Sequence, residues 1–149
     1  DDALERAEAL GAEHVLHAGR DADPAATIRA VTGGGAAVSV DALGSPATAV
    51  ASVRCLRRRG RHVQVGLLLG HESTPPIPMA LLVAQELEVY GSHGMAAHDY
   101  PPMLALVAAG KLRPGLLVGR VIGLQDAGRA LAAMDGWSSG GMTVVDMSL

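Results

Sequence analysis

The chain has 149 residues, 49% of them hydrophobic, and a formal net charge of -3. This length suffices for one domain, or for a domain and a fragment, with a sizeable core. The charge shows no basic excess and so speaks against a protein that binds nucleic acid. No apolar run is long enough to span a bilayer and no signal-peptide pattern is present, so we expect a cytoplasmic protein without a membrane partner. The single cysteine, Cys55, argues against a disulfide framework and a Cys-rich zinc site.

Hydrophobic periodicity, helix caps and turn residues predict alternating helices and strands along the whole chain. In chain order they are helix Ala3–Leu10, strand His14–His17, helix Pro24–Thr32, strand Ala37–Leu43, a helix from Pro46, strand His62–Leu67, helix Met79–Gln85, strand Leu87–Ser92, helix Asp99–Ala109, strand Leu116–Ile122, helix Leu124–Met134 and strand Met142–Met147.

Residues 32–67 are the best-marked part of the sequence and are typical of a βαβ crossover. Ser45 can cap the helix, and Pro46 suits its first position, where no amide donor is needed. Arg57–Arg59 are expected near the negative C-terminal end of this helix, and Gly60 is expected to end it in a left-handed conformation.

The strands begin near residues 14, 37, 62 and 87, about one crossover unit apart. This alternation predicts an open parallel α/β sheet with flanking helices. Beyond residue 92 the spacing changes, which indicates a C-terminal tail of helices and strands outside that sheet. The first helix also lacks the strand that should precede it in a crossover. We therefore expect the sheet to be incomplete and the chain to be a piece of a longer protein.

Gly33–Gly35 resemble a phosphate-binding loop only in composition. Such a loop needs a strand before it and a helix after it, so that the N-terminus of the helix faces the phosphate. Here the helix comes first and the strand second. We interpret the three glycines as a helix end and a turn.

The spacing of the histidines does not predict a metal site. His14 and His17 lie three residues apart on a predicted strand and so point to opposite faces. His62 is expected at the start of its strand, the wrong end for a ligand crevice. His93 follows the end of a strand and is retained as a candidate, with an ordinary loop histidine as the other interpretation. No Gly-x-Ser-x-Gly pattern occurs and Cys55 is expected to be buried, so we assign no nucleophile.

Several segments share their order and spacing with a known family. They are Leu4-Glu5-Arg6-Ala7, Leu10-Gly11-Ala12, Thr32-Gly33-Gly34-Gly35-Ala36, Val40-Asp41-Ala42-Leu43-Gly44-Ser45, Leu56-Arg57-Arg58-Arg59-Gly60-Arg61, Val63-Gln64-Val65-Gly66, Glu88-Val89-Tyr90-Gly91-Ser92 and Asp126-Ala127-Gly128-Arg129-Ala130-Leu131. Together they resemble the medium-chain dehydrogenase/reductase superfamily, and most closely its zinc-dependent alcohol dehydrogenase branch. No single segment is diagnostic, but their order covers nearly the whole chain.

The resemblance implies a partial dinucleotide-binding domain of the Rossmann type at residues 1–92. It implies that residues 93–149 pack on a catalytic domain outside this chain. The glycine fingerprint, the acidic residue for the adenosine ribose and the zinc ligands would all precede Asp1, so the chain would hold no catalytic residue and no metal ligand. Many relatives carry an arginine after the glycine before the last strand, where it reaches coenzyme phosphate. Here Gly141 is followed by Met142, which leaves that contact without its arginine.

The coenzyme, NAD or NADP, would meet three strand ends. The cofactor-binding residues that the resemblance implies are Ala42, Leu43, Gly44, Val65, Gly66, Leu67, Ser92 and His93. Small and apolar residues suit this place, because backbone groups can approach the nicotinamide ring and a dry wall favours hydride transfer.

The implied function is an oxidoreductase that transfers hydride between a nicotinamide coenzyme and an alcohol, aldehyde or ketone, with zinc polarising the oxygen in the parent protein. A zinc-free quinone or enoyl reductase of the same superfamily is one alternative, and a stand-alone, non-catalytic α/β binding module is the other. We expect a small-molecule substrate and a homo-oligomer, dimer or tetramer, paired through the strand at 87–92. The chain alone is expected to be inactive and to bind coenzyme weakly or not at all.

Overall fold

The computed structural model describes residues 2–17, 20, 23–134, 136 and 140–149. The chain divides into two compact units. The sheet unit comprises residues 16–94, and the tail unit comprises residues 1–15 and 95–149. Within the described part of the chain, no helix is long and apolar enough to cross a membrane.

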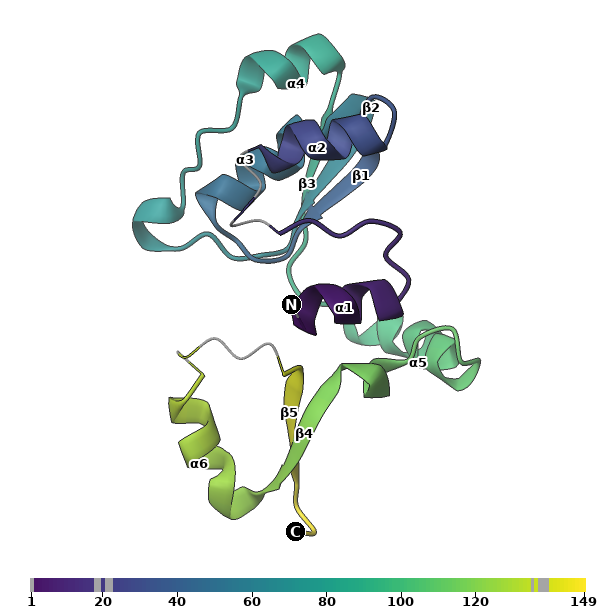
Figure 1. The fold of residues 1–149 in the computed structure, drawn as a ribbon, viewed down its shortest axis with the longest axis vertical. Helices are drawn as coiled ribbons and strands as arrows, with labels where there is room; N and C mark the ends of the chain where they lie inside the picture. Colours follow the sequence, from purple (N-terminus) through teal and green to yellow (C-terminus); the bar gives the residue numbers. More distant parts are fainter. Residues whose placement is uncertain (1, 18–19, 21–22, 135, 137–139) are drawn as a thin grey trace. The chain divides into compact units, whose positions relative to one another are not determined.

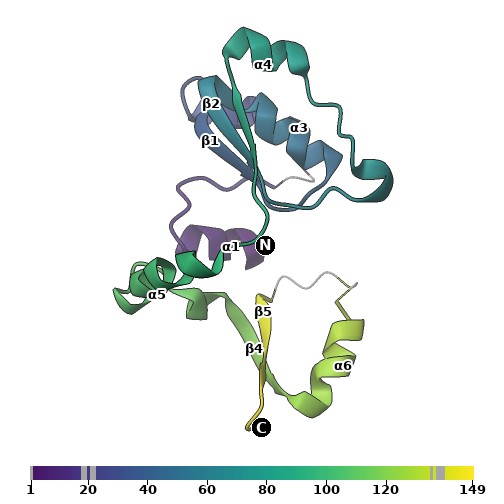
Figure 2. The same ribbon diagram turned by 180° about the vertical axis from the view of Figure 1, so that it is seen from behind.

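Three parallel strands in the order β1-β2-β3 form the sheet unit. Helix α3 connects β1 to β2, α4 connects β2 to β3, and α2 leads into β1. Helices α2 and α3 lie on one face of the sheet, as the front and back views together show (Figures 1 and 2). The predicted open parallel α/β sheet with flanking helices is therefore confirmed. The bounds are α2 Pro24–Val31, β1 Ala36–Asp41, α3 Pro46–Arg54, β2 Leu56–Gln64, the 3-10 helix η1 Gly70–Glu72, α4 Met79–Gln85 and β3 Glu88–Gly91.

Helices α2 and α3 both start as the sequence predicts. The Asp23 carboxylate accepts a hydrogen bond from the amide of Ala26 at 3.1 Å. Ser45 and Thr48 form a reciprocal capping box, in which each side chain bonds the backbone amide of the other. A proline follows each capping residue, where no amide donor is missed.

The interpretation of Gly33–Gly35 as a helix end and turn is also confirmed. Their φ angles are +65°, +131° and +129°, all in the region that favours glycine. The amides of Gly33 and Gly34 bond back to carbonyls of α2. A Cβ on Gly35 would lie 2.5 Å from the amide nitrogen of Arg57, so glycine also permits close packing against β2.

The start of β2 differs from the prediction. Helix α3 ends at Arg54, and β2 begins at Leu56, so Arg57–Arg59 belong to the strand and not to a helix end. Ala36 pairs with Leu56 while Val38 pairs with Arg61, which leaves extra residues of β2 in a bulge. The helix pattern continued too far because Leu56 keeps the apolar spacing of α3 but lies in the next element.

The role predicted for Gly60 is also wrong. Its φ is not positive, and the left-handed residue at this place is Arg59, with φ +58°. Gly60 is buried, and a Cβ there would lie 2.8 Å from the carbonyl oxygen of Arg57 and 3.0 Å from the Cβ of Leu56. Glycine is needed here for close packing within the bulge.

The strand predicted at residues 14–17 is not formed. A strand requires a backbone ladder with a neighbour, and among the strands that the structure describes β1 is an edge strand. The strand predicted at His14–His17 is therefore wrong.

The buried apolar side chains of the described residues all belong to the sheet unit. They come from α2, from α3 and from the start of β2, and they fill the space between these helices and the sheet. Cys55 is among them, as predicted. The residues are Ala25, Ala49, Val53, Cys55 and Leu56.

The tail unit repeats the parallel crossover on a smaller scale. Strands β4 and β5 pair in parallel, and α6 connects them. The structure thus confirms the helices and strands predicted in this region, with ends shifted by a few residues. The bounds are α1 Asp2–Ala9, the 3-10 helix η2 Ala97–Asp99, α5 Tyr100–Ala108, the 3-10 helix η3 Pro114–Leu117, β4 Val118–Gly123, α6 Leu124–Ala132 and β5 Met142–Asp146.

Candidate functional site

The three strands of the sheet unit end side by side. Asp41, the last residue of β1, pairs with Gln64, the last of β2, and Gln64 pairs with Gly91, the last of β3. The three segments that the sequence singled out therefore leave the sheet at the same edge. Open α/β sheets bind their ligands at this edge. The segments 42–44, 65–67 and 92–93 are called the carboxyl edge below.

Two of these segments touch through their backbones. The amides of Val65 and Gly66 both donate to the carbonyl oxygen of Asp41, at 2.9 and 2.8 Å. A Cβ on Gly66 would lie 2.5 Å from the carbonyl carbon of Leu43, and a Cβ on Gly44 would lie 2.7 Å from that of Gly66. Both glycines are therefore required for the close approach of the loops 42–44 and 65–67.

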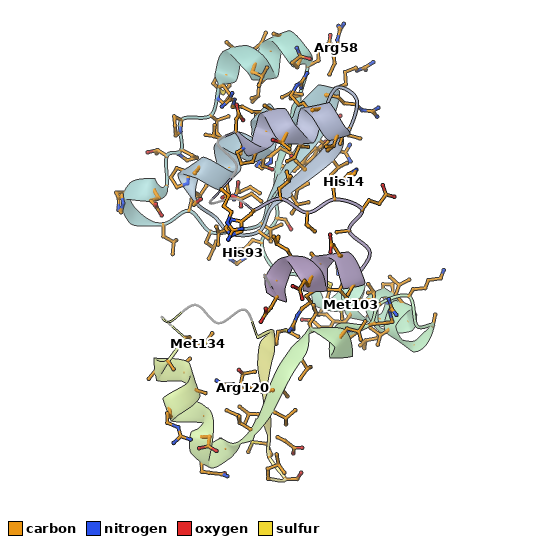
Figure 3. The ribbon with its side chains drawn as sticks, viewed as in Figure 1. His14, Arg58, His93, Met103, Arg120 and Met134 are labelled. Carbon is orange, nitrogen blue, oxygen red and sulfur yellow. The ribbon has the colours of Figure 1, made fainter. Side chains whose placement is uncertain are left out.

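The third segment follows β3. The amide of Ser92 donates to the carbonyl oxygen of Gln64 at 2.9 Å, so the parallel ladder continues to the start of this segment. His93 comes next and is exposed (Figure 3). The backbone thus holds Ser92 at the carboxyl edge, beside the end of β2.

The Asp41 carboxylate holds the loop 42–44. It is 3% exposed, and its Oδ1 accepts the amides of Leu43 and Gly44 at 3.0 and 3.1 Å. Its Oδ2 accepts the side-chain amide of Gln64 at 2.7 Å. Burial raises the pKa of this carboxyl group, but hydrogen bonds from Gln64, from Thr48 and from the two backbone amides outweigh burial. The pKa of Asp41 therefore lies below its ordinary value of 3.8.

Gln64 connects Asp41 with the second loop and with a histidine. Its Nε2 donates to Asp41 and also to the carbonyl oxygen of Gly66, at 2.8 Å. Its Oε1 is left to accept from Nε2 of His62, at 3.2 Å. Nε2 of His62 therefore carries a proton, and its Nδ1 lies 3.0 Å from the Ser52 hydroxyl of α3. His62 is only 2% exposed.

Sequence reasoning missed Asp41, His62 and Gln64. His62 was expected at the start of its strand, but β2 begins at Leu56, and the histidine lies near the end that carries the loops. One signal was present in the sequence: Ser39 and Asp41 on one strand, and His62 and Gln64 on the next, are polar at every second position. This period places them on one face of each strand.

The carboxyl edge presents apolar side chains to solvent. Leu43 is 64% exposed, Leu67 61% and Val65 44%. Apart from His93, none of the eight residues has a side chain that can carry charge. The edge therefore suits a flat, weakly polar group, and it has no lysine or arginine for a phosphate.

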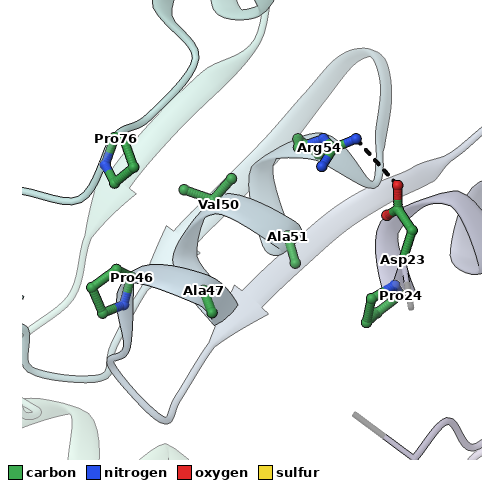
Figure 4. A pocket seen from close by; sticks show the side chains of 8 residues that line it. All are labelled: Asp23, Pro24, Pro46, Ala47, Val50, Ala51, Arg54 and Pro76. Atoms are coloured by element: carbon green, nitrogen blue, oxygen red, sulfur yellow. Dashed lines mark hydrogen bonds and ion pairs between the residues drawn. The ribbon is translucent and has the colours of Figure 1, made fainter. Parts of the chain in front are cut away.

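The rest of the described chain offers little chemistry of other kinds. No three His, Cys, Asp or Glu side chains in it lie close enough together to hold a metal ion. A cavity of about 370 Å³ lies beside α3, where Arg54 pairs with Asp23 at 3.2 Å (Figure 4). None of the eight candidate residues lines this cavity. Its lining is Asp23, Pro24, Pro46, Ala47, Val50, Ala51, Arg54 and Pro76.

Comparison with known proteins identifies the family. The sequence profile described as zinc-binding dehydrogenase matches residues 1–109. The chain belongs to this family. The resemblance to the medium-chain dehydrogenases found in the sequence is thereby confirmed. The comparisons do not favour the zinc-free reductase or the stand-alone binding module.

The chain is similar to an NAD-dependent alcohol dehydrogenase of Sulfurisphaera tokodaii. It is 30% identical over 146 residues, which are 97% of this chain and 40% of the relative. A 2-dehydro-3-deoxy-L-galactonate 5-dehydrogenase of Pseudoalteromonas atlantica is 34% identical over 89 residues, 60% of this chain and 25% of that protein. A crystal structure of an NAD-dependent alcohol dehydrogenase superposes with a TM-score of 0.82 at 28% identity, covering 97% of this chain and 40% of the other. The chain thus spans less than half the length of the relatives it matches.

Proposed function

We propose that the protein containing this chain is a nicotinamide-dependent oxidoreductase that interconverts an alcohol with an aldehyde or ketone. This chain is its coenzyme-binding portion. Membership of the zinc-binding dehydrogenase family supports the proposal, and so do two similar proteins named NAD-dependent alcohol dehydrogenase. The observation that carries it is the carboxyl edge, where three parallel strands end and the loops 42–44 and 65–67 expose apolar side chains.

The residues of the carboxyl edge fit the nicotinamide half of a coenzyme. Leu43, Val65 and Leu67 supply an apolar wall, and Gly44 and Gly66 let the two loops lie close together beneath it. A bound coenzyme supplies the hydride donor or acceptor at this place. The wall orients the nicotinamide ring and excludes water from one of its faces. Ser92 and His93 are proposed to approach the carboxamide.

The same edge does not supply an anchor for the pyrophosphate. Of its residues only His93 can become cationic, and Met142 stands where many relatives carry an arginine. We propose that the phosphate-binding turn, the zinc ligands and the catalytic residues lie outside this chain. The chain alone is then expected to be inactive and to bind coenzyme weakly or not at all. NAD is the coenzyme named for the similar proteins, and NADP is the alternative.

We also propose the domain division expected from the sequence, with the coenzyme domain at 1–92 and a segment at 93–149 that packs on a catalytic domain. The tail unit has an apolar cavity of about 880 Å³ between α6 and the strands β4 and β5. Arg120 on β4 and Met134 just past α6 belong to its lining (Figure 3). Met134 is 73% exposed, as expected for a side chain that another domain covers.

A homo-oligomer paired through β3 is a further part of the proposal. In the described sheet β3 is an edge strand, and all its residues are exposed. Parallel ladders leave the outer backbone groups of such a strand free for a second copy. Light scattering of the full-length protein tests this, with a dimer or tetramer expected and a monomer contradicting it.

Calorimetric titration with NAD(H) and NADP(H) tests the function. We expect the full-length protein to bind one of these coenzymes with a Kd in the micromolar range. With an alcohol or carbonyl substrate present, we also expect it to form or consume the reduced coenzyme, which is followed by absorbance. We expect the chain alone to bind far more weakly. Failure of the full-length protein to bind either coenzyme would overturn the proposal.

A further inference from the structure

One side-chain amide links the two loops that touch at the carboxyl edge. The Nε2 of Gln64 donates to the Asp41 carboxylate at 2.7 Å and to the carbonyl oxygen of Gly66 at 2.8 Å. Asp41 in turn accepts the amides of Leu43 and Gly44. Gln64 therefore holds the loop 42–44 through Asp41, and it holds the loop 65–67 directly.

The orientation of this amide is set from the interior of the sheet unit. His62 donates from Nε2 to Oε1 of Gln64, and its Nδ1 lies 3.0 Å from the Ser52 hydroxyl and 3.4 Å from that of Ser39. The donors of His62 and Gln64 both point toward the carboxyl edge. A reversed amide would place the oxygen of Gln64 against the two acceptors, Asp41 and Gly66, which is unfavourable. The series thus has one consistent direction.

We propose that Gln64 is a positioning residue for the coenzyme: its amide sets the spacing of the loops 42–44 and 65–67 that form the wall against the nicotinamide. His62 and Asp41 are its partners on either side. The effect on coenzyme rests on the proposed function, whereas the hydrogen-bond series stands on the geometry of this chain. The contacts of the series are with the two loops, and its members are proposed to act through them.

A substitution that keeps the volume of Gln64 but removes its hydrogen bonds tests the role. In the full-length protein, Gln64→Met leaves the Asp41 carboxylate and the Gly66 carbonyl without their shared donor. The loops are then no longer held at a fixed spacing, and we expect the Kd for NADH to rise about tenfold, which corresponds to the loss of one or two hydrogen bonds. The control is Gln85→Met at the end of α4, the same chemical change away from the carboxyl edge.

A second variant gives a spectroscopic readout that a merely structural role does not move. Asp41→Asn keeps the oxygen that accepts the amides of Leu43 and Gly44 but turns the other carboxylate oxygen into a donor that faces the Gln64 amide. Two NH₂ groups then face each other, because a reversed Gln64 amide would set its oxygen against the Gly66 carbonyl. We expect the hydrogen bond from Gln64 to residue 41 to be lost, which moves the resonance of the Gln64 side-chain amide. Nitrogen-15 NMR of labelled glutamine side chains in the full-length protein measures this change.

The outcomes separate the two proposals. A tenfold weaker Kd in Gln64→Met, an unchanged Kd in Gln85→Met and a moved Gln64 amide resonance in Asp41→Asn support the positioning role. If Gln64→Met binds NADH with the Kd of the wild type, the positioning role is overturned and the proposed function stands. An unchanged Gln64 amide resonance in a folded Asp41→Asn variant overturns the hydrogen-bond series. Absence of coenzyme binding by the wild type overturns the proposed function and, with it, the role of Gln64.

Discussion

The sheet unit and the tail unit are built from the same crossover of two parallel strands and a helix, but they cover their apolar side chains differently. In the sheet unit, Val53 of α3 is 0% exposed and Leu56 at the start of β2 is 2% exposed. In the tail unit, Leu124 and Leu131 of α6 are 57% and 70% exposed. The difference lies in what surrounds the crossover and not in the crossover itself.

A second helix accounts for the contrast. In the sheet unit, α2 packs beside α3, and α3 packs on β1 and β2. In the tail unit, α6 covers only a two-stranded sheet, and a large apolar cavity remains between them. A crossover therefore buries its core only when a further layer adds to it. The tail unit thus exposes apolar side chains, as expected for a surface that we propose a catalytic domain covers.

The largest expected effect comes from truncating a buried side chain of the sheet unit. Leu56→Ala removes a fully buried side chain and should lower the free energy of unfolding of the sheet unit by about 2–5 kcal/mol. Leu131→Ala, on the exposed face of α6, should change the unfolding free energy of the chain by less than about 0.5 kcal/mol. Urea unfolding of both variants measures the two effects. If Leu131→Ala is as costly as Leu56→Ala in this chain, the contrast between the units is wrong.

The next prediction compares two glycines with opposite roles. Gly66→Ala places a Cβ against the backbone of Leu43 and should cost about 1–3 kcal/mol, because the loops must separate. Gly128→Ala, in α6, meets no atom within 4 Å and should stabilise the helix by about 0.5–1 kcal/mol. Thermal unfolding of both variants checks the signs. A stabilising Gly66→Ala would show that the two loops are not in close backbone contact.

A smaller effect concerns pH. The pKa of Asp41 is lowered in the folded chain, so its contribution to stability is present above its ordinary pKa of 3.8 and is lost as the pH falls through the folded value. Urea midpoints measured from pH 6 down to pH 2 should fall less steeply for Asp41→Asn than for the wild type. Asp146→Asn is the control. Hydrogen bonds from Ser148 lower the pKa of Asp146 as well, but solvent screens the charge of this carboxylate. An equal change in slope for both variants would contradict a special role for Asp41.

The smallest effect is expected at the surface of the sheet unit. Arg54 and Asp23 pair at 3.2 Å across the cavity beside α3, with 52% and 42% of their side chains exposed. Arg54→Met should lower the unfolding free energy by about 0.2–1 kcal/mol, and added salt should reduce the difference. Urea unfolding at low and high salt measures it. A loss as large as that of Leu56→Ala would mean that this ion pair, and not the apolar core, holds α2 to α3.

The sequence predicted the elements whose signals are local. Ser45 and Pro46 mark a helix start, and Gly33–Gly35 mark a helix end, because capping and positive φ depend on a few neighbouring residues. The eight residues of the carboxyl edge could be placed because strand ends follow from strand order. Their proposed contact with coenzyme came from the family resemblance and stays a prediction.

The parts that the sequence did not predict depend on tertiary pairing. The bulge at Arg57–Arg59 follows from how β2 packs on β1. The segment 14–17 was predicted as a strand, but within the described residues it forms no ladder with a neighbour. The series from His62 through Gln64 to Asp41 joins two strands, and only the register of β1 with β2 brings these side chains together. Such contacts leave only the alternation of polar residues as a trace in the sequence.

The loops 42–44 and 65–67 are proposed to face the nicotinamide of a bound coenzyme. Hydrogen–deuterium exchange of the full-length protein, with and without NADH, tests this proposal most directly. We predict that NADH slows exchange in peptides covering 42–44, 65–67 and 92–93 and leaves those covering β4 unchanged. Binding of NADH with no slowing at the three segments would contradict the account.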